Sequence, residues 1–411
     1  MATRGNIWIA LFYALLVVVH VVVTMQRARH WEFPNRTDEL QHLSFVIHFR
    51  ENRDLFPDYS RMRVLQVAND FSWSPDPNYL NHPIFYHAFL GAFVNRDDTL
   101  GSAALRLRRV NAGMSALGLT LILVFGFGAF REVRQHLLFG LCVVFCPMIG
   151  GLGGQINADN LAFLGGALVL VGLGRLFREG IGRRGTLVTG IGFALGALAK
   201  LTAAVMLGFW IVLALLALGR RGGLAAARPG GPMLILGVLA LVGCAPYIVN
   251  LLSIGTPLYD NAALFKVSDD FQVLPFSEFA AWFLHGLAAS WSTDQPSDAV
   301  QMATFVLVVG LMAFGFLARG KGPAVPVGRC CALAALAVLP IHMGYDYAQH
   351  RAAGHLAGAD FRQYLPLWGG LAAGVGLAVA ALRREGARAA LVLLVAGLLF
   401  YSAVLAPLRS G

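Results

Sequence analysis

Long apolar runs constrain this chain more than any other feature of its sequence. Runs of roughly 18–25 residues with almost no charged side chain recur along the chain, and about 20 apolar residues are enough for a helix to cross a bilayer core of ~30 Å. Of the 411 residues, 57% are hydrophobic, and the mean hydropathy is +0.65. The sequence therefore predicts an all-α polytopic membrane protein, with residues 1–411 forming one transmembrane domain.

The apolar runs predict about eleven transmembrane helices. Residues 185–219 form one run of 35, which as a single helix would measure about 52 Å. We therefore expect a tight hairpin of two short helices, with its turn near "GALAKLTA" and Lys200 at the far membrane surface. Residues 82–94 are apolar but too short to span, so they are expected to form an interfacial or re-entrant helix. The expected spans are 7–25, 103–128, 136–151, 158–175, 185–199, 201–219, 232–252, 298–318, 329–345, 364–382 and 389–407.

The distribution of charge predicts the orientation of these spans. If the N-terminus is inside, Arg4 and the short inside loops hold 16 of the 32 Lys and Arg residues but only three of the 22 acids. Cytoplasmic loops collect Lys and Arg, so the net charge of +10 reflects topology, and no nucleic-acid partner is expected. The chain has three lysines and 29 arginines, which is typical of a GC-rich bacterium. We therefore expect a bacterial inner-membrane protein, with the opposite face in the periplasm.

The long loops all lie on this outer side, where loops on a helical scaffold commonly carry function. A first external loop is expected at 26–102, with amphipathic juxtamembrane helices, and a second long loop at 253–297. A shorter outer loop covers 346–363.

The first outer loop begins with a polar cluster, "PNRTDELQHLSF" (34–45), that contains Asp38, Glu39 and His42. If a helix begins near Asn35, Asp38 and His42 share one of its faces, because they are four residues apart. A carboxylate could then act as a base, and a histidine could orient a substrate or contact a phosphate. Acids in a first helical turn also complement the helix dipole, so the spacing alone leaves both interpretations open.

Further polar residues are expected at the outer ends of the spans. Asp159, in "QINADNLAFL", begins a span, and Lys200 interrupts the apolar hairpin. A cation there either reaches the membrane surface or meets an anion. His82 precedes the short apolar helix, and Arg362 and Tyr364 lie at the entrance to the tenth span. Arginine suits bidentate phosphate recognition, although Arg and Tyr are also common at membrane interfaces.

Carboxylates, cations and histidines would thus share an outer mouth beside a lipid-facing cavity. This combination suits a substrate with a phosphate head and a long lipid tail. The order of the features, over about 340 residues, resembles the integral-membrane C-type glycosyltransferases (GT-C), including the protein mannosyltransferase-like and lipid A aminoarabinose transferase-like branches. The matching segments are Asp38-Glu39, "HPIF" (82–85, with Ile84 in place of a second proline), "LRLRRVNAG" (105–113), Asp159, "GALAKLT" (196–202) and "RQYLP" (362–366, with Gln363 inserted).

The resemblance implies an inverting transfer of a sugar from a polyprenyl-phosphate donor to a lipid, glycan or protein acceptor. It implies that Asp38 is the general base, that Glu39 assists it or orients the acceptor, and that Lys200 and Arg362 stabilise the leaving lipid phosphate. His42, His82, Asp159 and Tyr364 are the remaining substrate-binding candidates. No nucleotide is expected as a cofactor. A divalent ion stays open, because no metal-ligand spacing in the sequence is specific enough to assign one.

Other classes of protein fit parts of the pattern. O-antigen polymerases and ligases are also multispan enzymes with outer arginines and histidines, but their long functional loop comes late in the chain. A transporter or lipid flippase should carry ionisable groups near the midplane of its spans, where this sequence has few. A non-catalytic membrane scaffold is a third alternative, in which loss of the Asp38 charge would have no effect on the cell.

Overall fold

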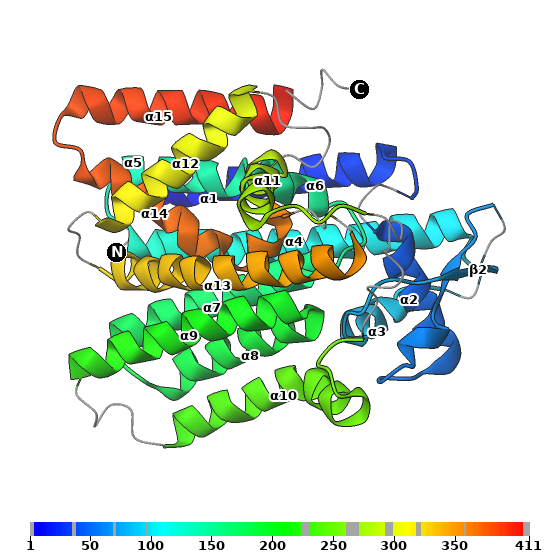
Figure 1. Cartoon of the computed structure of the whole chain (residues 1–411). Helices are drawn as coiled ribbons and strands as arrows, with labels where there is room; N and C mark the ends of the chain where they lie inside the picture. Colours follow the sequence, from blue (N-terminus) through cyan, green and yellow to red (C-terminus); the bar gives the residue numbers. More distant parts are fainter. Residues whose placement is uncertain are drawn as a thin grey trace.

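The computed structural model describes residues 4–34, 38–68, 71–95, 97–222, 230–259, 271–291, 299–317, 322–354, 356 and 359–405. Within these residues, nine helices are long and apolar enough to cross a membrane (Figure 1). They are α1 (Arg4–His30), α4 (Leu100–Ala129), α7 (Asp159–Glu179), α9 (Leu201–Gly222), α10 (Gly231–Ile254), α12 (Ala299–Leu317), α13 (Ala324–Ala353), α14 (Trp368–Ala381, after the 3-10 helix η4, Phe361–Leu367) and α15 (Glu385–Phe400, followed by the π-helical η5, Tyr401–Leu405). The chain is a multi-pass membrane protein.

Two shorter segments bring the number of spans to the predicted eleven. The first is α8 (Arg183–Ala199), which packs against α9 across a break at Lys200, so the predicted hairpin is confirmed. The second is the predicted span 136–151, which consists of α5 (Val133–Val144) and α6 (Pro147–Leu152). Pro147 begins α6 and cannot donate a backbone hydrogen bond to α5, so the helix is interrupted there.

The late outer loop differs from the sequence prediction, and the turn residue Lys200 lies inside the protein, with 4% of the residue exposed. The predicted loop 346–363 is in large part helical, since α13 continues to Ala353. Asp346 and His350 are buried in this last part of α13, and the His350 ring stacks on Phe279 of the short helix α11 (Phe276–Ala289), whereas Arg351 is exposed. The segment is thus a helix end that another helix partly covers.

The elements of the first outer loop gather at one end of the helical bundle, on the right in Figure 1. They are α2 (Glu39–Asn52), the 3-10 helix η1 (Tyr59–Arg61), the strands β1 (Arg63–Leu65) and β2 (Trp73–Pro77), and α3 (Phe85–Gly91). The two strands pair antiparallel, a small addition to the predicted all-α fold. α2 begins at Glu39, later than the predicted start near Asn35, which lies outside the described residues. Asp38 occupies the N-cap position, in the left-handed region at φ 58°.

A buried ion pair joins this outer layer to the bundle. Arg108, in α4, donates from Nε and Nη2 to the two carboxylate oxygens of Glu39, at 2.7 and 2.6 Å. Arg108 also donates to the carbonyls of Ala28, Trp31 and Glu32, at 2.8–3.1 Å, and so holds the chain as it leaves α1. Glu39 in turn accepts from the backbone N–H of Ile156, at 3.2 Å. Neither side chain is more than 4% exposed. One pair thus fixes α1, α2, α4 and the segment before α7.

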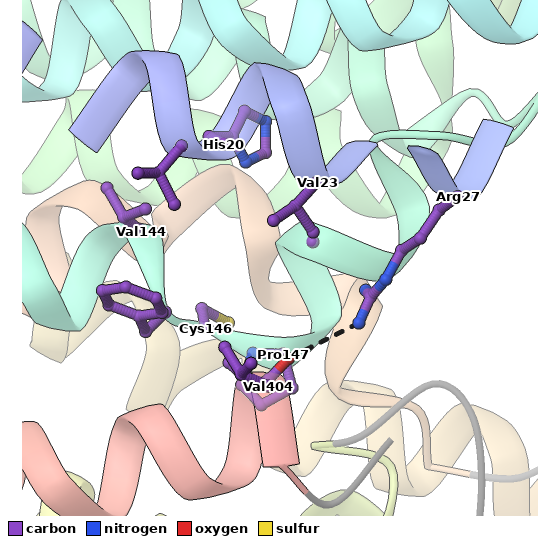
Figure 2. Close-up of a pocket in the computed structure, with 11 residues that line it drawn as sticks. His20, Val23, Arg27, Val144, Cys146, Pro147 and Val404 are labelled. Atoms are coloured by element: carbon purple, nitrogen blue, oxygen red, sulfur yellow. Dashed lines mark hydrogen bonds between the residues drawn. The ribbon is translucent and has the colours of Figure 1, made fainter. Parts of the chain in front are cut away.

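The first and last spans meet near the same end of the molecule. Arg27, in the last turns of α1, reaches across a narrow apolar crevice and donates to the carbonyl of Ala403 in η5, at 3.5 Å (Figure 2). Val23 of α1, Val144 and Pro147 of α5–α6, and Val404 of η5 line this crevice. The arginine therefore links the two terminal helices at a C-terminal carbonyl, where a cation is favourable.

A glycine sets the position of η4 against α7. A Cβ atom placed on Gly166 would overlap the backbone carbonyl of Pro366, so only glycine allows the two segments to approach this closely. The carbonyl belongs to the 3-10 helix that carries Arg362 and Tyr364.

Gly166→Ala is expected to lower the stability of the protein, because the backbone of η4 must move. Overpacking of this kind costs about 1–3 kcal/mol. Thermal unfolding of the purified protein in detergent should show a lower apparent Tm. The matched control is Gly113→Ala in α4, where a Cβ meets nothing within 4 Å. Equal Tm values for the two variants would contradict the close approach.

Glu39→Gln is expected to destabilise the fold strongly, because Arg108 is left as a buried and uncompensated charge. Breaking such a pair costs about 3–5 kcal/mol. Adding Arg108→Met should restore part of the apparent Tm, since the unpaired charge is then gone. Asp58→Asn, which breaks an exposed pair with Arg61, should leave the Tm unchanged. A double variant that shows the sum of the two single losses would contradict the pairing.

Candidate functional site

A polar cavity of about 160 Å³ lies at the end of the bundle where the outer elements gather. Five separate segments contribute to it: the start of α2, the strand-to-helix segment before α3, the turn before α7, the break between α8 and α9, and η4. Its lining residues are Asp38, His42, Tyr79, Leu80, Asn81, His82, Asn157, Asp159, Lys200, Arg362 and Gln363. Six of the eight site residues predicted from the sequence therefore line one cavity.

Asp38 and Arg362 form an ion pair across the cavity. Arg362 donates from Nη1 to Oδ2 of Asp38, at 3.1 Å, and the Tyr79 hydroxyl donates to Oδ1 of Asp38. The guanidinium also pairs through Nε with Oδ2 of Asp360, at 2.8 Å. Asp360 is the N-cap of η4, where its Oδ1 accepts from the backbone N–H of Arg362. Arg362 is thus held between two carboxylates, one of which also fixes its backbone.

Lys200 and Asp159 form a second ion pair in the same cavity. Lys200 lies in the break between α8 and α9 and pairs with Asp159, the first residue of α7. The backbone N–H of Asp159 donates to Oδ1 of Asn157. Lys200 and Asp159 are 4% and 2% exposed. Of the two interpretations of Lys200, the structure favours the one in which the ammonium meets an anion.

Three histidines line or back this cavity. Nδ1 of His42 and Nε2 of His87 share a hydrogen bond of 3.0 Å, and the His42 ring stacks on His82 with 5.8 Å between centroids. Burial, followed by the charge of Lys200, lowers the pKa of His82 to about 4. Burial, followed by the charges of His82, Arg362 and Lys200, places the pKa of His42 well below its usual value. Both imidazoles are therefore neutral at neutral pH, when they can donate or accept hydrogen bonds.

Two predicted site residues lie outside the cavity. The carboxylate oxygens of Glu39 are directed to Arg108 and to the backbone of Ile156. Tyr364 does not line the cavity, and its hydroxyl lies 3.3 Å from Nδ1 of His342, whose Nε2 is 3.3 Å from Oδ2 of Asp346. Arg362 and Tyr364, which the sequence places together, thus belong to two different clusters.

Several residues of the site were not among those predicted. Tyr79 lies in the segment "WSPDPNYLNHP" (73–83) of the first outer loop, and nothing in that segment indicates a partner for it. Arg108 was noted only as part of the Arg-rich start of a span, although an arginine on an apolar helix face is a signal of a buried anion. His87 repeats the histidine of "HPIFYH", and Gln363, which interrupts the predicted motif, accepts from the Thr202 hydroxyl at 3.0 Å.

The described residues also bear on metal binding. Among them, no group of three or more His, Cys, Asp or Glu side chains is arranged to hold a metal ion. The carboxylates of Asp159 and Asp38 pair instead with Lys200 and Arg362.

Comparison with known proteins bears on the fold. No family model and no curated protein matches this sequence. The structure is similar to ArnT from Cupriavidus metallidurans in the apo state, with a TM-score of 0.57 and 16% identity over 95% of this chain and 63% of ArnT. ArnT bound to undecaprenyl phosphate gives a TM-score of 0.54 and 15% identity over 96% of this chain and 64% of ArnT. The chain thus spans just under two thirds of the length of ArnT.

ArnT is an aminoarabinose transferase with the C-type glycosyltransferase fold. The resemblance predicted from the order of the sequence motifs is therefore confirmed for the fold. At 15–16% identity, the similarity concerns architecture and not substrate. The chain has the membrane-embedded fold of the C-type glycosyltransferases.

Proposed function

We propose that this protein is a C-type glycosyltransferase that transfers a sugar from a polyprenyl-phosphate-linked donor to a lipid, glycan or protein acceptor. The observation that carries the proposal is the meeting of Asp38, Lys200 and Arg362 in one cavity, in the fold of an enzyme that has been crystallised with undecaprenyl phosphate. The excess of basic residues at the opposite end supports the proposal that this cavity faces the periplasm, with the protein in a bacterial inner membrane.

The cations account for the donor and its leaving group. Lys200 and Arg362 would hold the phosphate that links sugar to lipid, Arg362 through the planar fork that matches phosphate oxygens. They are fixed in place before the reaction, by Asp159 and by Asp360, so little reorganisation is needed when negative charge develops on the leaving phosphate. This electrostatic role requires no nucleotide.

The carboxylate accounts for the acceptor. Asp38 would take the proton of the acceptor hydroxyl as the hydroxyl oxygen bonds to the anomeric carbon. The bond from that carbon to the phosphate oxygen breaks on the opposite face, and its electron pair leaves with the lipid phosphate. One displacement of this kind inverts the anomeric centre. His42 and His82, as neutral imidazoles in the wall of the cavity, would hydrogen-bond sugar hydroxyls.

Two of the remaining predicted residues take supporting roles. Asp159 would position Lys200, and Glu39 would position Asp38, its neighbour in the chain, through the pair with Arg108. The predicted substrate-binding role of Tyr364 has no cavity contact to support it, since its hydroxyl lies 3.3 Å from Nδ1 of His342 and the residue does not line the cavity. Glu39 does not line the cavity, so no contact supports its predicted role as an assistant to the base.

Asp38→Asn is expected to abolish sugar transfer while leaving the protein folded in the membrane. Loss of a general base lowers a rate by about 10²–10⁴-fold. Transfer from a polyprenyl-phosphate sugar to membrane acceptors, followed by mass spectrometry of the products, would measure this. Asp58→Asn removes an equal charge from an exposed part of the same loop and should keep full activity. Full activity in Asp38→Asn would remove the base assignment.

Lys200→Ala and Arg362→Ala are expected to weaken use of the donor, because each removes a cation from the phosphate. The KM for the donor should rise and kcat should fall in both. Arg362→Lys keeps the charge but cannot contact two groups as a planar fork, so it should recover only part of the loss. Normal dependence of the rate on donor concentration in both alanine variants would contradict the proposed phosphate site.

A further inference from the structure

We infer that the donor phosphate and Asp38 compete for the same guanidinium, so that binding of the donor releases the base for catalysis. The inference rests on the proposed function, which supplies the phosphate and the role of Asp38. It adds an order to the reaction: the donor must bind before the acceptor can be deprotonated.

The first support is the charge balance of the cavity. Asp38 and Asp360 flank Arg362, and Asp159 pairs with Lys200. Among the described residues of the site, three carboxylates thus face two cations. The neutral histidines add no positive charge. A phosphate that approaches the Nη1 edge of Arg362 therefore meets a donor that Asp38 already occupies.

The second support is the difference between the two carboxylates on Arg362. Asp360 is tied to the backbone of η4, since it accepts from the backbone N–H of Arg362 at 2.9 Å. Asp38 contacts the guanidinium only through Nη1, lines the cavity itself, and lies in the turn before α2. The side chains of Asp38 and Asp360 are similarly exposed, at 20% and 27%, so the difference between them is the place of Asp38 in the cavity wall and the tie of Asp360 to the backbone. Of the two partners, Asp38 is therefore the one that an incoming phosphate displaces.

The other cation is less suited to the exchange. The side chains of Lys200 and Asp159 are 5% and 3% exposed, and both lie where the chain turns between buried helices. Separating them would leave two charges with little access to water, which is costly. Lys200 can attract a phosphate through its charge while it stays paired, whereas Arg362 can turn its Nη1 edge to the ligand.

The exchange has a chemical consequence for Asp38. While it is paired with Arg362 and accepts from Tyr79, both of its oxygens are engaged. Once the phosphate takes Nη1, Oδ2 becomes free to accept the proton of an acceptor hydroxyl, and the Tyr79 hydroxyl continues to orient the group through Oδ1. The base thus becomes available only when a sugar donor is present.

The test is the binding of undecaprenyl phosphate to the full-length protein in nanodiscs, with wild type, Asp38→Asn and Asp58→Asn compared. A competitor for a cation weakens binding of the ligand that needs this cation. Asp38→Asn should therefore bind the lipid phosphate about tenfold more tightly than wild type, although it transfers no sugar. Asp58→Asn, with the same change in net charge, should bind as wild type does. Asp38→Ser should show the same increase in affinity for the lipid phosphate. This second variant keeps the test valid if Asp38→Asn does not fold.

The outcomes separate the inference from the proposed function. Equal or weaker binding by both folded Asp38 variants, with clear binding by wild type, would overturn the competition and leave the donor site in place. A similar gain in Asp58→Asn would show that net charge alone controls binding, and would also overturn it. Absence of binding by wild type would overturn both the donor site and the inference.

Discussion

The buried pair between Arg108 and Glu39 is the interaction on which the arrangement of the outer end depends. It joins the end of α1, the start of α2, α4 and the segment before α7 through six hydrogen bonds. Removing one partner leaves a charge where water cannot reach it, so the pair specifies one geometry strongly. Asp38 directly precedes Glu39 in the sequence, so the fixed position of Glu39 also restricts the backbone of Asp38. The position of the candidate base is thus set by an ion pair in which it takes no part.

The cavity is assembled from segments that are far apart in the sequence, and each is held by its own local constraint. Lys200 separates α8 from α9, Asp159 begins α7, and Gly166 lets η4 approach α7. Lys200 and Asp159 thus lie where regular helices begin or end, and the two side chains pair with each other. In a buried site of low dielectric constant, an unpaired charge is costly and the attraction between paired charges is strong. Exchanging one partner for another therefore changes the free energy of the site substantially.

The sequence predicted the spans, their two-sided charge and most of the residues of the cavity, because each of these depends on composition or on short segments. It did not predict which of two adjacent acids faces the cavity. Asp38 and Glu39 differ by one position, and their separation follows from the left-handed backbone of Asp38 and from Arg108, 69 residues away from Glu39. The partner of Asp38 is 324 residues distant, and nothing local to either residue specifies the contact. Segment 346–353 was predicted as a loop from its polar residues, but α13 continues through it, with Asp346 and His350 buried and Arg351 exposed.

The neutral histidines complete the electrostatic argument. Their burial, and the neighbouring cations, lower the pKa of His82 to about 4 and that of His42 well below 6.5, so both are uncharged from neutral pH down to mildly acidic conditions. Were they protonated, the cavity would hold an excess of cations, and a phosphate could bind without displacing Asp38. Because they are neutral, Arg362 remains divided between its carboxylates, and the lipid phosphate has to compete for it. The two imidazole rings beside Asp38 therefore add no positive charge to the cavity. Asp38 and the lipid phosphate thus both depend on the guanidinium of Arg362.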